Sequence, residues 1–509
     1  MKDCMPDDRS QLRRDLILVF AIGLFLRLTL LFFFPAPFGN DAAGRLYFRD
    51  SLLAWHWLPV TQALVHFTYV LTHSVVIVRL VFAIAGSLAA VAFAFYLQAF
   101  APRRAALIGG LLFAINAQAV YLSLMPYQEI VFLGMLFGSL AFFARAPEMQ
   151  KPNRNFIIGS ILYGLACLTR YEAWFILPIL FAARIWRAVK TRKAAVILRQ
   201  SVKSFIGLGW GAALWLLVNW QFWDSPTAFL FHRPDQAFYA WNPHGEIMRI
   251  MNYLGNMLYW LMRFGSPVIL FAIPGIGVVW KNRQKVFPVL WPLFVLFLFV
   301  LTFLIFIAGQ EFATANRFVM IPLSVVLIFA ALGLDDFIAR PSNFSRRLPQ
   351  KLLQPIPKVM AAVFLFLALL FYGAVPVVNA NRLADYREPY EVAKFLETHL
   401  ANRESAVIIA RSFDGEVPMP YQRVFGQLNF DKEHLFSSFL LESQNLIASE
   451  SFVRRRNLRF IVVFGNDQLR TDNDAFFLQL VQNSQNNIKQ VFANNAAAIY
   501  ERTSSWSKN

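Results

Sequence analysis

The sequence has 509 residues, of which 57% are hydrophobic and 16% aromatic, and its mean hydropathy is +0.48. A water-soluble fold of this length could not bury so much apolar surface, so the composition favours a polytopic membrane protein. The formal net charge is +18, but most Lys and Arg residues lie in short loops beside apolar segments, which argues against nucleic-acid binding.

The first predicted membrane span covers residues 16–34 and follows Arg13 and Arg14. A basic start resembles a signal peptide, but this apolar run is too long and lacks a small-x-small cleavage site, so we expect a retained anchor.

The two cysteines are Cys4, in the N-terminal tail, and Cys167, inside an apolar segment. The expected topology keeps them apart, so no disulfide is predicted.

About eleven apolar segments qualify as membrane spans. Because backbone polar groups in lipid must be satisfied within the segment, all are predicted to be helices. The segments lie near residues 16–34, 74–98, 106–124, 128–144, 156–170, 172–187, 203–221, 262–280, 286–308, 316–334 and 359–379. We find no low-complexity segment and no internal repeat of the kind that builds transporters from inverted halves.

The charges of the loops orient these spans. If the N-terminal tail is cytoplasmic, every loop rich in Lys and Arg falls on the cytoplasmic side, as the positive-inside rule requires. These loops contain Arg103 and Arg104, Arg145 to Arg154, Arg184 to Lys203, Lys281 to Lys285, and Arg340 to Lys358. The loops 35–73 and 222–250 are then outside, and an odd number of crossings puts the C-terminus outside as well.

From about residue 381 the chain is richer in Asn, Gln, Glu and Asp, and no apolar run is long enough to span a membrane. Patterns predict helices over 388–400, 432–453 and 474–482, strands over 405–410 and 458–464, and a closing hairpin over 491–500. We therefore expect an all-α polytopic membrane domain over residues 1–380, followed by a soluble extracytoplasmic α/β domain over residues 381–509.

The loop after the first span carries an acidic and aromatic-rich segment. Asp41 is followed by Arg45 and Arg49, and then by the stretch from Trp55 through His56 to Pro59. An acid beside guanidiniums at the membrane surface suits a reaction between a lipid-linked phosphate and a polar acceptor, because the acid can take a proton while Arg binds phosphate. The alternative is an ordinary solvated loop acid.

Two further acidic positions lie on the expected outer face. Glu129 opens the fourth span, where a carboxylate is favoured by the helix dipole even without a function. Arg170, Tyr171 and Glu172 interrupt an otherwise apolar stretch, and ionisable groups at such depth tend to face a cavity or a partner. The alternative is a tight turn between two short helices.

Two more arginines stand out by position. Arg317 begins the tenth span and could bind an anionic lipid head group or simply anchor the helix at the interface. Arg27 lies in the middle of the first span, so it should face the interior of the bundle and find a partner there.

Several motifs in this order resemble the GT-C superfamily of polyprenyl-phosphate-sugar glycosyltransferases. They are Leu-Arg-Leu at 26–28, the early Asp41, Trp-Leu-Pro at 57–59, Leu-Thr-Arg-Tyr-Glu-Ala at 168–173, and Asn-Arg-Phe-x-x-Ile-Pro at 316–322. The closest branch is that of protein O-mannosyltransferases, aminoarabinose transferases and bacterial galacturonic-acid transferases. The likeness covers roughly residues 16–335, and parts of the C-terminal tail resemble domains that some members append.

The resemblance implies an inverting transfer from a polyprenyl-phosphate sugar to a lipid, glycan or protein acceptor at the outer membrane face. Asp41 matches the catalytic acid of the first loop, and Glu129 matches the acidic position of the second. Candidates to bind the donor phosphate are Arg45, Arg170 and Arg317, with Glu172, Tyr171 and His56 as supporting residues.

The sequence also departs from the family pattern. Ala42 follows Asp41 where many members carry a second acid, and Gln62 stands in a region where a His is common. These departures leave the use of a divalent metal ion, Mg or Mn held by Asp41 and Glu129, as an open alternative.

A transporter or lipid flippase is the rival function. It would need polar groups through the membrane midplane, whereas the polar groups of this sequence collect at one face. A scaffold presenting the tail would leave Arg170 and Glu172 without a purpose.

Overall fold

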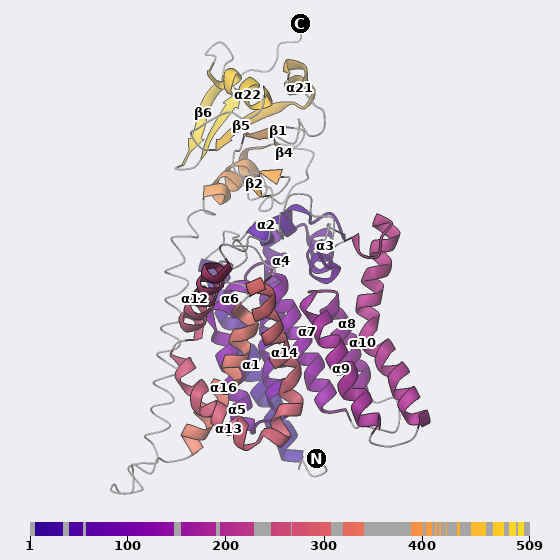
Figure 1. Ribbon diagram of the computed structural model, residues 1–509. Coiled ribbons are helices and arrows are strands. Elements are labelled where there is room, and N and C mark those ends of the chain that lie inside the picture. The colour runs from indigo at the N-terminus through magenta and orange to yellow at the C-terminus, as the bar shows by residue number, and fades with distance from the viewer. Residues whose placement is uncertain are drawn as a thin grey trace, which may run out of the picture. The chain divides into compact units, whose positions relative to one another are not determined.

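The protein is a mostly helical multi-pass membrane protein with a mixed five-stranded sheet near its C-terminus (Figure 1). This confirms the predicted fold class. The computed structural model describes residues 6–33, 40–53, 57–146, 154–189, 194–228, 246–265, 267–306, 319–339, 388–400, 404–409, 413–414, 417–418, 424, 435–437, 449–464, 472–482, 488–494 and 497–502.

Helices make up most of the chain before residue 340. In chain order they are α1 (Pro6–Phe33), α2 (Asn40–Tyr47), α3 (Pro59–Thr72), α4 (Val75–Leu97), α5 (Arg103–Ile115), α6 (Ala117–Ser123), α7 (Gln128–Ala144), α8 (Arg154–Cys167), α9 (Glu172–Val189), α10 (Ala194–Trp223), α12 (Glu246–Gly265), the 3-10 helix η2 (Val268–Phe271), α13 (Ala272–Lys281), α14 (Arg283–Phe306) and α16 (Met320–Ala339).

Within the described chain, four helices are long and apolar enough to cross a membrane, namely Ser10–Phe33 of α1, α4, α10 and α16. Two bent pairs pass the same test together: α5 with α6 at 57°, and Met257–Gly265 with Val268–Lys281 at 95°. The helices α7 and α8 and the part Val286–Leu298 of α14 are shorter apolar helices. Each predicted span from 16–34 to 316–334 overlaps one of these helices or α9, whereas 359–379 lies outside the described residues.

Small residues let several helices approach each other closely. A Cβ atom added to Gly211 of α10 would lie 2.2 Å from the carbonyl oxygen of Gly164 on α8. A Cβ on Gly275 of α13 would lie 1.8 Å from the carbonyl oxygen of Phe329 on α16. Because lipid gives little hydrophobic drive for helices to associate, such close backbone packing is what holds neighbouring spans together.

The loop predicted over residues 35–73 contains two short helices, α2 and α3. Helix α3 has an unusual distribution of residues, since it buries Gln62 while Phe67, Val70 and Leu71 are 55%, 48% and 81% exposed. A helix surrounded by water would turn its apolar side inward. Val65 and Tyr69 of α3 are buried as expected, and the exposed apolar side chains on its other side suit contact with lipid.

Contacts between residues divide the chain into two compact units. The first unit contains Met1–Leu31, Leu53–Thr61 and Leu80–Pro376. The second unit contains Phe32–Leu52, Gln62–Arg79 and Val377–Asn509. Helix α2 and most of α3 therefore group with the C-terminal sheet, which the sequence analysis did not predict.

The C-terminal sheet has the strand order β4-β1-β5-β7-β6. Strand β1 pairs in parallel with β4 and β5, and β7 pairs antiparallel with β5 and β6. The described strands and helices here are β1 (Ser405–Ile409), β2 (Phe413–Asp414), β3 (Val417–Pro418), β4 (Leu435–Ser437), α21 (Glu450–Arg455), β5 (Leu458–Phe464), α22 (Asp472–Gln482), β6 (Ile488–Ala493), β7 (Ala497–Arg502) and a helix over 388–399.

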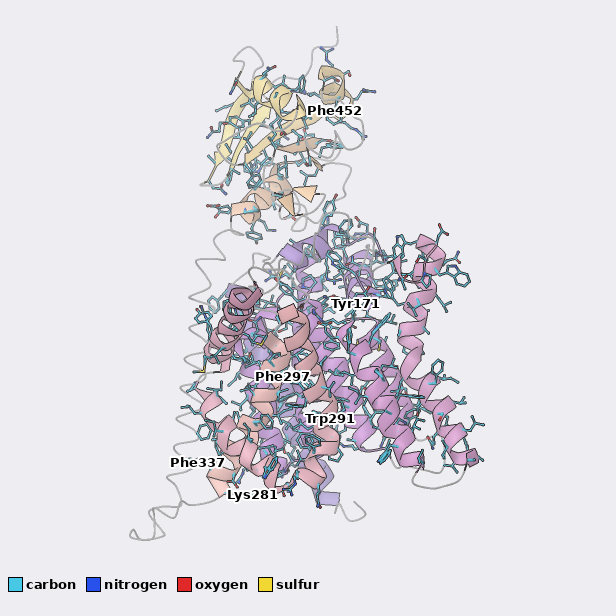
Figure 2. All side chains as sticks on the ribbon, viewed as in Figure 1. Tyr171, Lys281, Trp291, Phe297, Phe337 and Phe452 are labelled. Carbon is cyan, nitrogen blue, oxygen red and sulfur yellow. The ribbon has the colours of Figure 1, made fainter. Side chains whose placement is uncertain are left out.

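Both faces of this sheet are covered, which explains why all of β1 is buried. Ala406 and Ile408 point into a core formed with the helix 388–399. Val407 and Ile409 point into a second core that includes Phe452 of α21, labelled in Figure 2, and residues of α22. The predicted strand 458–464, the helix over 474–482 and the hairpin are confirmed, as are residues 405–409 of the predicted strand 405–410.

The predicted helix over 432–453 is wrong at residues 435–437 and right at residues 450–453, while 432–434 and 438–448 lie outside the described residues. Residues 435–437 form strand β4, where Leu435 pairs with Ala406 and Ser437 with Ile408, and residues 450–453 belong to α21. Leu435 and Ser437 are buried on alternate positions of this short strand, so the pattern that matters there has a period of two.

Candidate active site

The first candidate segment lies in the second unit, on helix α2. Asp41 occupies the first turn of this helix, although its side chain is outside the described part of the structure. Arg45 follows four positions later in the last turn, so positions 41 and 45 share one face of the helix. Arg45 is 2% exposed. The backbone thus brings the predicted acid and the nearest predicted phosphate ligand together.

The turn after α2 is bound by the polar side of α3. The amide Nε2 of Gln62 lies 2.7 Å from the carbonyl oxygen of Phe48, 3.2 Å from that of Ser51 and 3.4 Å from that of Arg45. One turn later, Nδ1 of His66 lies 2.9 Å from the carbonyl oxygen of Arg49. A carbonyl oxygen accepts only, so this ring nitrogen carries the proton.

Aromatic rings also contact this segment. The guanidinium carbon of Arg49, a residue that is 1% exposed, lies 4.2 Å from the ring centroid of Tyr69 on α3, which is a cation-π contact. Tyr47, the last residue of α2, packs against the core that contains the helix 388–399. Burial raises the pKa of the Tyr47 phenol, so this side chain stays neutral at physiological pH.

The second candidate segment lies in the first unit and is a buried ion cluster. Arg170 donates from Nη1 to Oε1 of Glu129, and from Nε, at 2.8 Å, and Nη2 to Oε1 of Glu172. The side chains of Arg170, Glu129 and Glu172 are 6%, 5% and 15% exposed. With one guanidinium and two carboxylates, the cluster has a formal charge of −1. Of the cavity or partner expected for ionisable groups at this depth, the structure shows partners: Arg170 pairs with both Glu129 and Glu172.

The turn that carries Arg170 is tightly fixed. Tyr171, labelled in Figure 2, accepts a hydrogen bond at 3.0 Å from Nε1 of Trp215 on α10. On α9, Trp174 donates from Nε1 to the carbonyl oxygen of Cys167 at 2.9 Å. The N–H of Val60, at the start of α3, donates to the carbonyl oxygen of Leu168 at 3.1 Å.

An apolar cluster connects the same segments. Its buried members are Leu58, Leu168 and Trp215, and Tyr171 and Trp174 pack against it. Two motifs of the sequence resemblance, at 57–59 and 168–173, thus meet in one cluster although they are far apart in the chain. The consequence is a guanidinium held in a rigid position.

Two predicted site residues, His56 and Arg317, lie outside the described residues. Arg27, for which no partner was predicted, is fully buried and donates to Oγ of Ser123 at 2.6 Å and to the carbonyl oxygen of Ala114 at 2.9 Å. Sequence reasoning missed Ser123 and the structural use of Gln62. The available signal was that each is a polar residue within an apolar segment.

The described residues give a poor fit for a metal ion at Glu129. Among them, no group of three or more His, Cys, Asp or Glu side chains is placed to hold one. The positive charge beside Glu129 is already the guanidinium of Arg170. We therefore derive no catalytic step through a metal.

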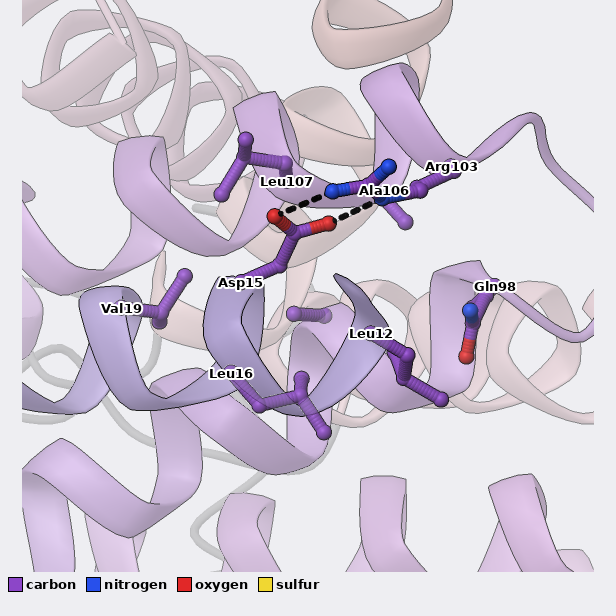
Figure 3. A pocket seen from close by; sticks show the side chains of 9 residues that line it. Leu12, Asp15, Leu16, Val19, Gln98, Arg103, Ala106 and Leu107 are labelled. Carbon is purple, nitrogen blue, oxygen red and sulfur yellow. Dashed lines mark hydrogen bonds and ion pairs between the residues drawn. The ribbon is translucent and has the colours of Figure 1, made fainter. Parts of the chain in front are cut away.

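A pocket between α1, α4 and α5 is shown in Figure 3. Apolar side chains including Leu12, Leu16 and Leu107 line it, together with an ion pair in which Nε and Nη2 of Arg103 lie 2.5 and 2.9 Å from the carboxylate oxygens of Asp15. No predicted site residue lines this pocket, so it is not a candidate for the reaction.

No protein-family model and no curated protein sequence matches this chain. Solved structures do match it over most of its length. ArnT from Cupriavidus metallidurans bound to undecaprenyl phosphate is 12% identical, with 96% of this chain and 98% of that chain covered and a TM-score of 0.57. The apo form of the same protein is 13% identical, with 94% and 97% covered and a TM-score of 0.56.

A second protein shows the same arrangement. The archaeal oligosaccharyltransferase AglB from Archaeoglobus fulgidus, in complex with an inhibitory peptide and a dolichol-phosphate, is 13% identical, with 90% of this chain and 70% of that chain covered and a TM-score of 0.54. The chain therefore has the fold that ArnT and AglB share, which agrees with the fold that the sequence resemblance implied.

Proposed function

We propose that this protein transfers a sugar from a polyprenyl-phosphate donor to an acceptor at the outer face of the membrane. The observation that carries this proposal is the likeness of fold over 96% of the chain to ArnT with undecaprenyl phosphate bound. Fold alone does not fix activity, so the proposal also rests on an acid and an arginine placed one turn apart on α2.

In the proposed reaction, the carboxylate of Asp41 takes the proton from an acceptor hydroxyl or similar nucleophile. The acceptor atom then attacks the anomeric carbon of the sugar as the bond from that carbon to the phosphate oxygen breaks. The electron pair of this bond leaves with the polyprenyl phosphate. A single displacement of this kind inverts the configuration at the anomeric carbon.

The leaving phosphate gains negative charge during this step, and a fixed cation beside it lowers the barrier. We assign this role first to Arg45, because its position lies one helical turn from Asp41. Arg317 remains a second candidate from its sequence motif. Arg170 fits the role less well, because a phosphate beside it would also meet the carboxylates of Glu129 and Glu172.

For Arg170 we propose a different part in the same reaction, which is to orient Glu129. A carboxylate that accepts a hydrogen bond from a fixed guanidinium keeps its direction, so Glu129 can bind a hydroxyl of donor or acceptor. Tyr171 and Glu172 support this arrangement by fixing the turn that carries Arg170.

The test is turnover in proteoliposomes that contain the purified protein and a cell-envelope acceptor fraction. Radiolabelled undecaprenyl-phosphate mannose, aminoarabinose and galacturonic acid are offered separately, and transfer of label to acceptor is measured. We expect transfer from at least one donor, and a loss of about two orders of magnitude or more in Asp41→Asn.

Asp50→Asn is the matched control, because Asp50 is an exposed acid of the same loop, and we expect its turnover to stay within about threefold of the parent. Label that crosses the bilayer on an unchanged donor would instead indicate a flippase. Normal turnover in Asp41→Asn would remove Asp41 from the mechanism.

A further inference from the structure

The orientation of helix α2 decides where Asp41 and Arg45 point, and this helix has only 8 residues. An isolated helix of this length is not stable in water, because the cost of nucleation exceeds the gain from so few hydrogen bonds. Contacts to other parts of the chain must therefore hold α2 in place. Among the described residues, two such contacts lie at its C-terminal end and within the second unit.

The first contact is the amide of Gln62. Its side chain is fully buried, and Nε2 faces the carbonyl oxygens of Arg45, Phe48 and Ser51. The orientation of this amide is not ambiguous, because the reverse orientation would put Oε1 against three acceptors. Its two N–H groups thus face one carbonyl of the last turn of α2, that of Arg45, and two carbonyls of the turn that follows the helix.

His66 and Tyr69 extend this contact along α3. Positions 62, 66 and 69 recur at helical spacing and form one face, on which His66 binds the carbonyl oxygen of Arg49 and the Tyr69 ring contacts its guanidinium. The turn that follows α2 is therefore fixed at several successive residues, and Gln62 is the member nearest to α2 itself.

The second contact is made by the C-terminal domain. Tyr47 packs against a core that includes Val392 and Leu396 of the helix 388–399 and Phe460 of β5. That helix is itself held to the sheet, because Nδ2 of Asn494 donates to the carbonyl oxygen of Glu388 at 3.2 Å. The last residue of α2 thus packs against a core whose other residues lie more than three hundred positions further along the chain.

We propose that Gln62 and Tyr47 are positioning residues that fix helix α2 from its C-terminal end, so that the C-terminal domain takes part in placing Asp41 and Arg45. This rests on the proposed function, in which Asp41 is the base. Transfer reactions are sensitive to small displacements of catalytic groups, so loosening α2 should lower kcat more than it raises KM.

The experiment compares variants that remove each contact with variants that keep it. Gln62→Met has a similar length but no N–H, whereas Gln62→His keeps one donor at a similar reach. Tyr47→Ala removes the ring, whereas Tyr47→Phe keeps it. Val70→Met, on the exposed side of α3, introduces the same side chain as Gln62→Met without touching α2 and serves as control.

We expect kcat for the accepted radiolabelled undecaprenyl-phosphate sugar to fall about tenfold or more in Gln62→Met and Tyr47→Ala, with KM changed by less than about twofold. The variants Gln62→His and Tyr47→Phe should stay within about threefold of the parent, as should Val70→Met. Hydrogen exchange followed by mass spectrometry should show faster exchange over residues 41–51 in the two damaging variants and unchanged exchange over α7 and α8.

Asp41→Asn is measured beside these variants to separate the two proposals. If Asp41→Asn is inactive while Gln62→Met and Tyr47→Ala turn over normally, the positioning roles are wrong and the proposed function stands. If Asp41→Asn is active, the base is elsewhere and both proposals fail. Faster exchange throughout the protein in Gln62→Met and Tyr47→Ala would show a general loss of structure and would also contradict specific positioning.

Discussion

Arg170 donates a hydrogen bond to Glu129, a residue 41 positions earlier in the chain, and both side chains are buried. The pair joins the start of α7 to the turn between α8 and α9. Removing one member of a buried ion pair leaves the other as an uncompensated charge, which costs more than the pair contributes. The cluster therefore gives a stability prediction as well as a functional one.

Arg170→Met should destabilise the protein by about 3–5 kcal/mol, because Glu129 and Glu172 then remain buried without their guanidinium. The measurement is thermal unfolding in detergent, followed by tryptophan fluorescence. Adding Glu129→Gln and Glu172→Gln should recover part of the loss. Arg154→Met, at the exposed start of α8, should leave the unfolding temperature nearly unchanged. Weaker undecaprenyl phosphate binding in Arg170→Lys at unchanged Tm would instead assign Arg170 to the phosphate.

Arg45→Lys should lower donor turnover about tenfold, because lysine keeps the charge but loses the planar fork that binds phosphate through two N–H groups. Arg263→Lys is the control, since that guanidinium contacts the Tyr259 and Trp260 rings on α12. Initial rates with saturating acceptor measure the effect. Equal rates for parent and Arg45→Lys would place the phosphate at another cation.

Gly86→Ala should be strongly destabilising, since its new Cβ would lie 2.3 Å from Cβ of Ser123 and 2.9 Å from Nε of Arg27. Overpacking of this kind costs about 1–3 kcal/mol. Gly277→Ala provides the matched control, because a Cβ at Gly277 meets no atom within 4 Å and alanine favours a helix. Unfolding temperatures of the two variants should therefore shift in opposite directions. An unshifted Gly86→Ala would show that α4 does not pack against Arg27 in this way.

The proposed orientation in the membrane can be tested with single cysteines in a background of Cys4→Ser and Cys167→Ala. We expect Asp50→Cys and Lys489→Cys to react with an impermeant thiol reagent in intact cells, since both positions are exposed. Val189→Cys, which is 45% exposed at the end of α9, should react only after the cells are opened. The reverse labelling pattern would turn the topology around and move the reaction to the cytoplasmic face.

The sequence predicts the helices well because long apolar segments are set by the membrane thickness alone. It does not predict α3 as a helix, since residues 59–72 are too few to span and carry Gln62 and His66. Those polar residues make sense only once the carbonyls of Phe48 and Arg49 lie beside them. A local pattern carries no information about such a partner.

The candidate site is predicted only in part for the same reason. The residue types of Glu129 and Arg170 are visible in the sequence as charges at the ends of apolar segments, which indicates that they matter. Their mutual contact depends on the packing of α7 against α8, and it changes the role that Arg170 fits best. Likewise, the grouping of α2 with the C-terminal sheet depends on contacts between distant segments that neither segment encodes alone.

The break between α5 and α6 is closed by a small set of residues that depend on one another. In a continuous helix, the N–H of Gln118 would donate to the carbonyl oxygen of Ala114. Here it donates to Oδ1 of Asn116 instead, and Nη1 of Arg27 donates to the carbonyl oxygen of Ala114 in its place. The guanidinium of Arg27 also donates to Oγ of Ser123. Beside these two side chains, only a residue without a side chain fits at Gly86. In related sequences, positions 27, 86, 116 and 123 should therefore change together. A relative without arginine at position 27 no longer needs glycine at position 86. Such a relative can also replace asparagine at position 116 and form one continuous helix there.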